Sequence, residues 1–455
     1  MSLRQALVIF GASGDLAAKK IFPALFSIEK KGLLGDDIEI IGASRREWEK
    51  KAFSEHVAKQ LDGHQDQDNA WKRLKNKLDF VQVEFTNQDH YRDLKKYLEE
   101  KKYQRVVFYY SVAPEFFEQI TEQIRATRIL EALEDYSVVV EKPFGHDLTS
   151  AIALHELFTS VFAEKEIYRI DHVLNKTALQ DIIDFRKHNF ALSQLLCAEK
   201  VDHIQVNYSE DIGIGNRGNF YEKTGAIRDM VQSHILEALG VLMADIPEDY
   251  SASSLQESRK ELIGSFSFES NGSKAKKIIT GQYEGYTQEE NVATDSNVET
   301  FVALRLKSNH KKWKNTPIYI KTGKKLNKKY FDLHVVFKYD PKNVFTFRIS
   351  PNSGINLRLW KDENVDLSYC YKSEKISDAY ENLLNSVLVD KKLMFVSQEE
   401  VEASWALIDS IRNQLKQSGQ DPILYEPGSK GPAEADEIME HGGWLDETIS
   451  DFCKI

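Results

Sequence analysis

The sequence predicts a protein with two domains, the first α/β and the second α+β. We expect an N-terminal Rossmann-like domain with a doubly wound parallel sheet, and a larger C-terminal domain built on a mostly antiparallel sheet. The chain has 455 residues, which at roughly 150 residues per domain corresponds to two or three domains. Apolar runs alternate with helical segments up to about residue 165, and runs with a period of two follow. We predict one boundary, which divides the chain into residues 1–170 and 171–455.

The first predicted elements form a βαβ unit. Residues 6–10 are an apolar strand, residues 16–30 carry apolar side chains at helical spacing, and residues 38–41 form a second strand. Strand, helix and strand in so short a stretch indicate two parallel strands joined by a crossover helix. The alternation continues with two more strands and the helix between them, residues 106–110, 137–140 and 115–133.

Beyond residue 171 the apolar residues alternate with polar ones. This period of two predicts strands with one face buried, which is typical of antiparallel sheets. The predicted strands are residues 203–208, 262–268, 300–306, 318–320, 333–337 and 344–349. The predicted helices are residues 177–189, 227–242, 379–388 and 399–415. The polar segment 267–277 is predicted to be an exposed hairpin turn.

The composition limits the classes of partner. A net charge of −11 and a pI near 5.7 argue against nucleic-acid and membrane partners, because both require basic surfaces. The longest apolar runs have the length of strands, well below the ~20 residues that span a bilayer. Cys197, Cys370 and Cys453 lack the spacing of zinc or redox motifs. We therefore expect a cytoplasmic protein with idle or buried thiols and no metal site.

A glycine-rich turn, with the sequence GASGDL, follows the first predicted strand and opens the first helix. Glycine lets the backbone approach a pyrophosphate, and a helix N-terminus offers free N–H groups and a favourable dipole. The third glycine that is usual in dinucleotide-binding turns is replaced by Leu16. The alternative is a tight turn without a ligand. The surrounding βαβ unit favours the nucleotide site.

The end of the second predicted strand indicates which nicotinamide nucleotide fits. An acidic residue at this position binds the ribose hydroxyls of NAD, whereas arginine suits the additional phosphate of NADP. The chain has Ala43, Ser44, Arg45 and Arg46 there. The sequence therefore predicts NADP, and the alternative is a solvated basic pair in a loop.

Three further segments carry groups suited to a phosphate, a sugar or a catalytic proton. On spacing alone, each segment also has an alternative without a ligand. Residues 168–176 fit a charged loop, residues 225–234 fit a helix with a structural histidine, and residues 321–329 fit a solvated lysine face. Asp229 and His234 would lie ~140° apart on an α-helix, so they would face one site only if it wrapped around the helix. The groups are Asp171, His172 and Lys176 in residues 168–176, Asp229 and His234 in residues 225–234, and Lys321, Lys324, Lys325, Lys328 and Lys329 in residues 321–329.

Taken together, these segments resemble the glucose-6-phosphate dehydrogenase family, in their order and over nearly the whole chain. Each motif is short, and their joint order makes the resemblance specific. The residues that carry it are 10–17, 22–26, 110–114, 141–145, 169–172 with Lys176, 217–218, 228–232 with His234, 322–324, Tyr425, 428–429 and 431–432.

The resemblance implies an NADP-dependent oxidation of glucose 6-phosphate to 6-phosphogluconolactone, the first step of the oxidative pentose phosphate pathway. His234 would be the general base that takes the proton of the anomeric hydroxyl as hydride leaves for nicotinamide, and Asp171 would orient it. The implied substrate-binding residues are His172, Lys176, Glu210, Asp229, Lys324, Lys329 and Lys142. The implied cofactor-binding residues are Gly11, Ala12, Ser13, Gly14, Asp15, Leu16, Lys19, Arg45 and Lys142. A homodimer or homotetramer is also implied, because the family uses one face of the second sheet for dimer contacts.

The chain departs from the family pattern at several positions. Val173 stands where the family has tyrosine, which removes a hydroxyl donor worth about 1.5–3 kcal/mol to a charged phosphate. Two alternatives therefore stay open, a related dehydrogenase that acts on another sugar or sugar phosphate and a non-catalytic NADP-binding protein. The other departures are Asn175 for glycine, Ser233 for asparagine, Lys321 for arginine, Lys430 for tryptophan, and Leu196, Cys197 and Ala198 for a Trp-Asn-Arg stretch.

Overall fold

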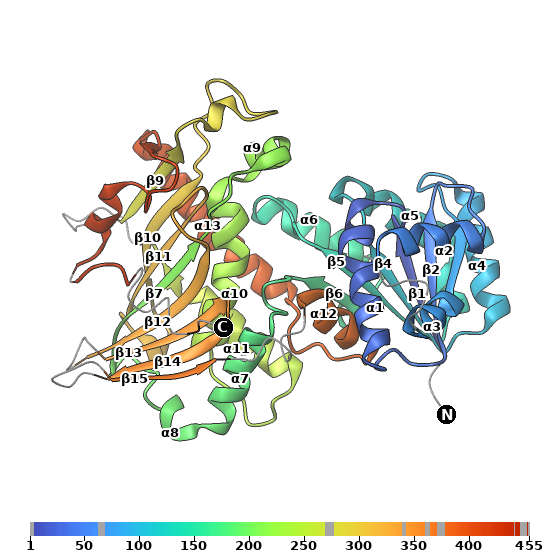
Figure 1. Cartoon of the computed structure of the whole chain (residues 1–455), viewed down its shortest axis with the longest axis horizontal. Coiled ribbons are helices and arrows are strands. Elements are labelled where there is room, and N and C mark those ends of the chain that lie inside the picture. Colours follow the sequence, from blue (N-terminus) through green and yellow to red (C-terminus); the bar gives the residue numbers. More distant parts are fainter. Residues whose placement is uncertain are drawn as a thin grey trace. The chain divides into compact units, whose positions relative to one another are not determined.

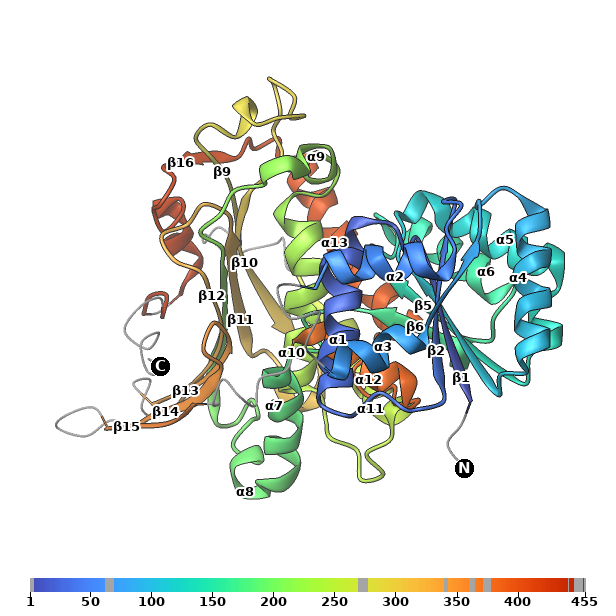
Figure 2. The ribbon, with the colours of Figure 1, turned by 45° about the vertical axis from the view of Figure 1, so that its right-hand side comes forward.

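The computed structural model describes residues 4–61, 69–268, 277–338, 343–359, 365–370, 378–440, 442–445 and 453. The chain forms two compact units, each built around its own sheet (Figures 1 and 2). Unit 1 comprises Met1–Gly145, Thr149–Asn175 and Ser377–Ser397, and unit 2 comprises His146–Leu148, Lys176–Ile376 and Gln398–Ile455. In the described ranges, no helix is both long and apolar enough to cross a bilayer.

Unit 1 holds a six-stranded sheet in which every neighbouring pair of strands is parallel. The strand order β3-β2-β1-β4-β5-β6 is that of the doubly wound Rossmann fold, so the predicted fold of the N-terminal domain is confirmed. The strands are β1 Gln5–Phe10, β2 Ile38–Ser44, β3 Leu78–Gln82, β4 Arg105–Tyr110, β5 Asp135–Glu141 and β6 Ile167–Ile170.

Burial on both faces explains why these strands read as continuous apolar runs. Leu7 and Ile9 of β1 pack with α1, α2 and α3, while Ala6, Val8 and Phe10 pack with α4, α5 and α6. Figure 2 shows the two groups of helices on opposite faces of the sheet. Each large apolar side chain buried in this way contributes about 1.5–3 kcal/mol. The helices are α1 Phe22–Lys30, α2 Lys50–Lys59, α3 Asn69–Lys77, α4 Gln88–Lys101, α5 Phe117–Thr127 and α6 Leu148–Thr159.

The predicted single helix over residues 115–133 is wrong. The segment is a 3₁₀ turn, Pro114–Phe116, followed by α5 and a second 3₁₀ turn, Ile129–Ala132. Helix α5 ends because Arg128 has a φ of 53°, in the left-handed region that terminates helices. The apolar spacing alone did not reveal this break.

Unit 2 holds a ten-stranded, mostly antiparallel sheet, as predicted. Its order is β15-β14-β13-β12-β7-β11-β10-β9-β16, with β8 paired to β10. Among the described pairs, β7–β11 and β9–β16 are parallel. The strands are β7 Val201–Ser209, β8 Phe266–Ser267, β9 Ile278–Tyr283, β10 Phe301–Ser308, β11 Pro317–Gly323, β12 Tyr330–Phe337, β13 Val344–Ser350, β14 Gly354–Leu359, β15 Val365–Cys370 and β16 Ile423–Tyr425.

Four helices of unit 2 pack on one another in the order α7, α10, α11 and α13, and α10 and α13 run beside the strands in Figure 2. A π-helix, Ile227–Ile235, leads into α10 where the sequence predicted one helix over residues 227–242. The helices are α7 Thr177–His188, α8 Phe190–Ser193, α9 Gly218–Ala226, α10 Leu236–Met243, α11 Ala252–Gly264 and α13 Gln398–Ser418.

The prediction of a strand over residues 262–268 is largely wrong. Residues up to Gly264 belong to α11, and β8 contains only Phe266 and Ser267. Leu262 and Ile263 are buried neighbours, which fits the inner face of a helix and not the alternation of a strand. Most of the predicted turn over residues 267–277 lies outside the described residues.

One segment from the C-terminal half of the chain belongs to unit 1. The predicted helix over residues 379–388 is confirmed as α12, Ala379–Leu388. Leu383, Leu384 and Val387 lie in the core of unit 1 with α1. The sequence placed this helix in the second domain, whereas the structure assigns residues 377–397 to the first unit.

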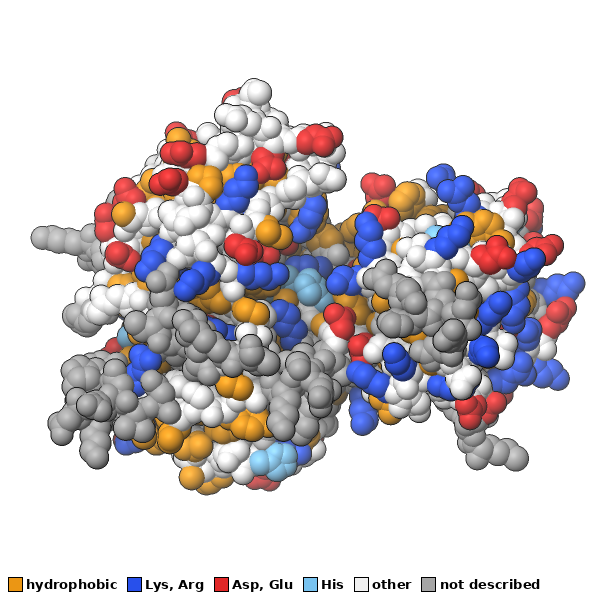
Figure 3. Space-filling model, viewed as in Figure 1, with side chains coloured by type: hydrophobic (Ala, Val, Ile, Leu, Met, Phe, Trp, Pro, Cys, Tyr) orange, Lys and Arg blue, Asp and Glu red, His pale blue; other side chains and the backbone are white. Residues whose placement is uncertain are grey.

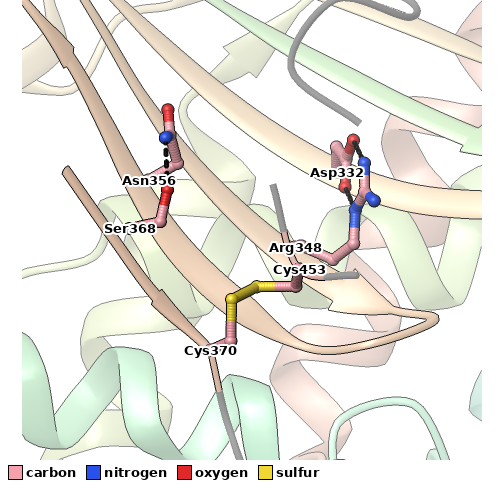
Figure 4. The surroundings of a disulfide bond; sticks show 6 residues. All are labelled: Asp332, Arg348, Asn356, Ser368, Cys370 and Cys453. Atoms are coloured by element: carbon pink, nitrogen blue, oxygen red, sulfur yellow. Dashed lines mark hydrogen bonds and ion pairs between the residues drawn. A yellow bond between two sulfur atoms is a disulfide. The ribbon is translucent and has the colours of Figure 1, made fainter. Parts of the chain in front are cut away.

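A disulfide joins Cys370, at the end of β15, to Cys453 near the C-terminus (Figure 4). The expectation of idle thiols is therefore wrong for this pair, and Cys197 is the free cysteine. The two cysteines are separated by 83 residues, so their spacing gave no indication of the bond. A Cβ on Gly354 would meet the sulfur of Cys453 at 2.6 Å, and the absence of a side chain at Gly354 thus leaves room for Cys453 against the sheet.

Candidate active site

The residues that the sequence singles out in unit 1 follow the carboxyl ends of its strands. Gly11 follows β1, Arg45 follows β2, Lys142 follows β5 and Asp171 follows β6. Open parallel sheets bind ligands outside this edge, at the point where the strand order reverses. In unit 1 the order reverses between β1 and β4, so the turn that begins at Gly11 lies at the expected place.

Position 11 requires glycine because of its backbone conformation and because a neighbouring strand leaves no room for a side chain. Its φ is +79°, and a Cβ there would meet the carbonyl oxygen of Ser111 at 2.3 Å. Glycine alone combines this φ with so close an approach. Because Ser111 follows β4, the turn passes directly against the end of the neighbouring strand. The helix that follows starts as a π-helix, Ala17–Ile21, before it continues as α1.

A pocket of about 520 Å³ opens beside this turn. This volume is typical of a small-molecule site. The predicted cofactor residues that line it are Gly11, Ser13, Gly14, Asp15, Leu16 and Arg45. Further lining residues, which the sequence did not assign to the cofactor, come from the ends of β2, β3 and β4 and are Ser44, Val83, Glu84, Phe85, Ser111, Val112, Ala113 and Phe116.

The remaining predicted cofactor residues do not line this pocket. Ala12 is fully buried beneath the turn. Lys19 pairs with Asp15 at 2.7 Å on the exposed surface of the helix. Lys142 lies at the end of β5, the second strand from β1 in the sheet.

The pocket residues fit the nucleotide part of NADP. Gly11 lets the backbone of the turn come close to a pyrophosphate. Arg45 lies in the pocket wall at the end of β2, where its guanidinium can bind the additional phosphate of the nucleotide. Both observations fit a nicotinamide nucleotide, and the position of Arg45 is the one that bears on the choice between NAD and NADP.

A buried turn follows β6. Asp171 is 1% exposed, and its Oδ1 accepts hydrogen bonds from the backbone N–H groups of Val173 at 2.7 Å and Leu174 at 3.4 Å. These bonds hold the carboxylate in one orientation. The Asn175 amide donates to the carbonyl oxygens of Asp171 at 3.2 Å and Met394 at 3.0 Å. Asn175, one of the departures from the family pattern, therefore fastens the turn to the returning segment.

In unit 2, Glu210 and Lys324 meet at the ends of two parallel strands. β7 and β11 are in register so that Ser209 lies beside Gly323, and the next residue of each strand forms an ion pair with a Nζ–Oε2 distance of 2.5 Å. Both side chains are largely buried, and the ammonium lies 5.1 Å from the ring centre of Tyr221. A donor and an acceptor held side by side suit a ligand rich in hydroxyl groups.

Asp229 and His234 lie on the π-helix Ile227–Ile235, and both are buried. The predicted separation of about 140° assumed an α-helix and is wrong. A π-helix forms hydrogen bonds from residue i to residue i+5, so residues five apart lie one turn apart along the helix. The ring centre of His234 lies 6.3 Å from that of Tyr208 in β7, so the helix passes close to the strand that Glu210 follows.

Two predicted lysines lie along the same edge of the unit 2 sheet. Lys176 donates from Nζ to Oγ of Ser350 at 3.3 Å, at the end of β13. Lys329 is exposed and precedes β12, which starts at the edge where the antiparallel strand β7 ends. The edge that carries Glu210 and Lys324 therefore also carries these two cations.

Predicted site residues lie on both units. In unit 1, Lys142 and Asp171 follow the neighbouring strands β5 and β6, and the half-buried His172 comes next in the chain. The ends of β3 and β4 were missed as parts of the cofactor pocket. The rule that neighbouring parallel strands end at one edge would have pointed to Ser111, because residues 106–110 were predicted as a strand.

Two family profiles match the chain in succession. The profile of the glucose-6-phosphate dehydrogenase NAD binding domain matches residues 8–181, and that of the glucose-6-phosphate dehydrogenase C-terminal domain matches residues 183–445. Together they include all the segments that carry the predicted site residues.

Curated relatives and solved structures agree with these profiles. Glucose-6-phosphate 1-dehydrogenase of Chlamydia pneumoniae is 33% identical, with 96% of this chain and 94% of the relative covered. The enzyme of the same name from Bacillus subtilis is 31% identical, with 97% of each chain covered. A solved glucose-6-phosphate dehydrogenase in complex with its substrate glucose 6-phosphate has a TM-score of 0.86 at 28% identity, covering 95% of this chain and 96% of that one. Glucose-6-phosphate 1-dehydrogenase from Mycobacterium avium has a TM-score of 0.86 at 27% identity, covering 98% and 99%.

Proposed function

Because the chain belongs to the glucose-6-phosphate dehydrogenase family, we propose that it oxidises glucose 6-phosphate to 6-phosphogluconolactone with NADP as hydride acceptor. One observation carries the proposal. Most of the ionisable residues to which the family resemblance assigns a role lie next to strand ends of the two sheets or on the π-helix beside β7, whereas Lys19 lies on the first helix. π-Helices are rare and are frequently found at functional sites.

The proposed chemistry is removal of a proton and a hydride from one carbon–oxygen unit of the sugar. His234 accepts the proton of the anomeric hydroxyl through its imidazole while hydride leaves C1, and the resulting C1=O bond makes the lactone. Asp171 orients His234 and stabilises the imidazolium. The two hydrogen bonds from backbone N–H groups to the Asp171 carboxylate support this assignment, because they fix its orientation. NADP, when bound, supplies the ring that takes the hydride.

The remaining residues bind and position the substrate. His172 and Lys176 neutralise the phosphate, and Glu210, Asp229 and Lys324 bind the sugar hydroxyls, with Lys329 nearby. The ion pair between Glu210 and Lys324 supports this assignment, since it offers an acceptor and a donor in fixed positions. Lys142 would lie between coenzyme and sugar when both are bound.

The experiment that tests the function is a measurement of NADPH formation by the purified protein with NADP and glucose 6-phosphate. A robust rate is expected. No rate with any sugar phosphate, while NADP still binds in a separate titration, would overturn the proposal in favour of a non-catalytic NADP-binding protein. Glucose, galactose 6-phosphate and glucosamine 6-phosphate belong in the same series, because Val173 is fully buried and brings no hydroxyl to a phosphate. A higher kcat/KM with one of these sugars would reassign the substrate.

We also propose a homodimer that uses the outer strands of the unit 2 sheet. Leu367 and Tyr369 of β15 are 55% and 60% exposed, and Leu359 of β14 lies on the same face. Figure 3 shows further hydrophobic side chains at the lower edge of unit 2, around α8. An exposed apolar strip on an edge strand is typical of a surface that another chain covers.

A further inference from the structure

A buried carboxyl group closes β5, directly before Lys142. Glu141 is 8% exposed, and Tyr109 of β4 donates a hydrogen bond to its Oε1 at 2.6 Å. Tyr380, in the first turn of α12, donates a second hydrogen bond to the same carboxyl group. Both tyrosines are buried as well. The proposed reaction uses none of these three residues.

The surroundings make the charge of Glu141 sensitive to pH. The pKa of Glu141 is raised to about 7, chiefly by burial and also by the nearby Asp171, against the lowering effects of the two phenol donors and the Lys142 ammonium. On the far side of the cluster, Asp378 and Lys20 lie near Tyr380. Near neutral pH the carboxyl group therefore exchanges between its charged and neutral forms.

The two tyrosines that bind Glu141 come from distant parts of the chain, one before Glu141 and one after it. Tyr109 belongs to the strand beside β5, whereas Tyr380 comes from the segment that returns to unit 1 after most of unit 2. A carboxylate bound by two phenols in a buried site has little freedom to move. The end of β5 is thereby fixed, and the next residue is the lysine for which the family resemblance implies a role towards both coenzyme and sugar.

We propose that Glu141 is a positioning residue, which holds the ammonium group of Lys142 through its own charge and is itself held by Tyr109 and Tyr380. The inference rests on the proposed function for its kinetic consequences. The ionised carboxylate attracts Lys142, and the protonated form releases it. The reaction therefore speeds up as the pH rises through the titration of Glu141.

The kinetic test compares the pH profiles of kcat/KM for the wild type, Glu141→Gln and Tyr380→Phe. Glu141→Gln is expected to lower kcat/KM for glucose 6-phosphate by about 10- to 100-fold, the effect of a misplaced active-site group. It is also expected to change the rise in the profile near neutral pH, to which the general base His234 contributes as well. Tyr380→Phe removes a donor that stabilises the charged form, so the rise is expected to move to higher pH. The Kd for NADP is expected to stay within about threefold in both variants, because Glu141 lies outside the nucleotide pocket.

Glu29→Gln is the matched control. Glu29 is a buried carboxylate of the same unit, paired with Arg73 at 2.5 Å and Lys77 at 2.7 Å, and it lies at the end of α1 away from the strand ends. Its substitution is expected to lower the melting temperature and to leave the pH profile unchanged. The proposal would be overturned if Glu141→Gln also lowered the melting temperature and left the pH profile unchanged, or if the profile of Tyr380→Phe were not shifted. Glu141 would then have a purely structural role.

A second readout does not depend on turnover. Lysines labelled by reductive methylation with ¹³C give NMR signals, and Lys142→Arg identifies the signal of Lys142. We expect this signal to follow the titration of Glu141 near neutral pH in the wild type and to stay constant over that range in Glu141→Gln. A wild type that forms no NADPH would count against the proposed function. A Lys142 signal with the same pH dependence in the wild type and in Glu141→Gln would overturn the inference about Glu141. If Glu141→Gln does not fold, the same comparison is made with Tyr380→Phe, whose signal is expected to titrate at higher pH.

Discussion

At the scale of single residues, the proposed preference for NADP over NAD rests on the charge of Arg45. Among the described residues that line the unit 1 pocket, Arg45 is the cation, and Asp15 and Glu84 are acidic. A guanidinium group binds a phosphate with hydrogen bonds roughly twice as strong as neutral ones. The two acids do not bind the extra phosphate, so the proposed preference for NADP depends on one side chain.

Arg45→Ala is expected to raise the Kd for NADP by about 10- to 100-fold and to change the Kd for NAD by less than about threefold. Titrations of both nucleotides against the purified variant measure the two values. Arg46→Ala is the control, because Arg46 is the neighbouring exposed arginine and lies outside the pocket lining. Equal losses for NADP and NAD in Arg45→Ala would contradict the role of Arg45.

His234→Asn is expected to lower kcat by about 10²- to 10⁴-fold, because the proton of the anomeric hydroxyl then has no general base. The KM for glucose 6-phosphate should change little, since asparagine keeps the shape and polarity of the site. Steady-state kinetics separate the two effects. Turnover at the wild-type rate would exclude His234 as the base.

The sequence predicted the residues of the nucleotide turn because their chemistry shows in their order. Five of them line the pocket, Gly11, Ser13, Gly14, Asp15 and Leu16. The sequence did not show that Ala12 is buried or that Lys19 pairs with Asp15, because both depend on how the helix turns after Gly14. The role of Asn175 was also hidden, since its partner Met394 lies far along the chain.

At the scale of elements, the turn from β1 to the first helix depends on glycine for two separable reasons. Gly11→Ala places a Cβ 2.3 Å from the carbonyl oxygen of Ser111 in addition to the strain of a positive φ. Gly32→Ala has the strain alone, because Gly32 has a φ of +69° with open space around it. We expect Gly11→Ala to lose NADP binding and to unfold at a clearly lower temperature, and Gly32→Ala to bind NADP normally with a smaller loss of stability. NADP titration and thermal unfolding of both variants check this, and intact binding in Gly11→Ala would contradict the proposed approach of turn and nucleotide.

Helix and strand positions were predicted where the apolar period was clear, as in α7, α13 and β7. The period did not distinguish an α-helix from the π-helix Ile227–Ile235, because both bury the same apolar residues and differ in which backbone groups pair. In residues 262–268 the apolar residues fit both a helix and a strand. The segment up to Gly264 is helical because it packs, as part of α11, against α10 and α13.

At the scale of the whole molecule, the disulfide connects the C-terminus to the last strand of the larger sheet. Cys453→Ser opens a loop of 83 residues and returns to the unfolded chain the entropy that the bond removed, which lowers stability by about 4–5 kcal/mol in the simplest model. We expect a melting temperature several degrees lower, and no change in Cys197→Ser. A thiol titration of the native oxidised protein is expected to find Cys197 alone. Three reactive thiols without a reductant would contradict the bond.

The proposed dimer makes a second prediction about the whole molecule. Light scattering coupled to size exclusion is expected to give twice the chain mass of 52.3 kDa. Leu367→Glu places a charge on the exposed apolar strip of β15 and is expected to shift the mass towards one chain. Leu33→Glu is the control, because Leu33 is 58% exposed on unit 1. A dimer that tolerates Leu367→Glu as well as Leu33→Glu would exclude this surface.

The sequence predicted a parallel sheet followed by a mostly antiparallel one, and it could not predict the return of residues 377–397. Helix α12 was correctly predicted from its own residues. Leu383, Leu384 and Val387 form an apolar face that would suit any apolar surface, so local pattern carries no information about which sheet it covers. Only the complementary surface of α1 determines that.

This return has a consequence for synthesis on the ribosome. The strands of unit 1 have all been translated by residue 170, yet α12 begins about 200 residues after the first part of unit 1 ends at Asn175. At roughly 5–20 residues per second, the delay is roughly 10–40 s. During that time the apolar face of α1 that later meets α12 is open to water, and Glu141 lacks the hydroxyl of Tyr380. The nascent chain is therefore most exposed to aggregation and to chaperones in the interval before α12 emerges, and the cofactor-binding half of the protein is completed by one of the last segments to be made.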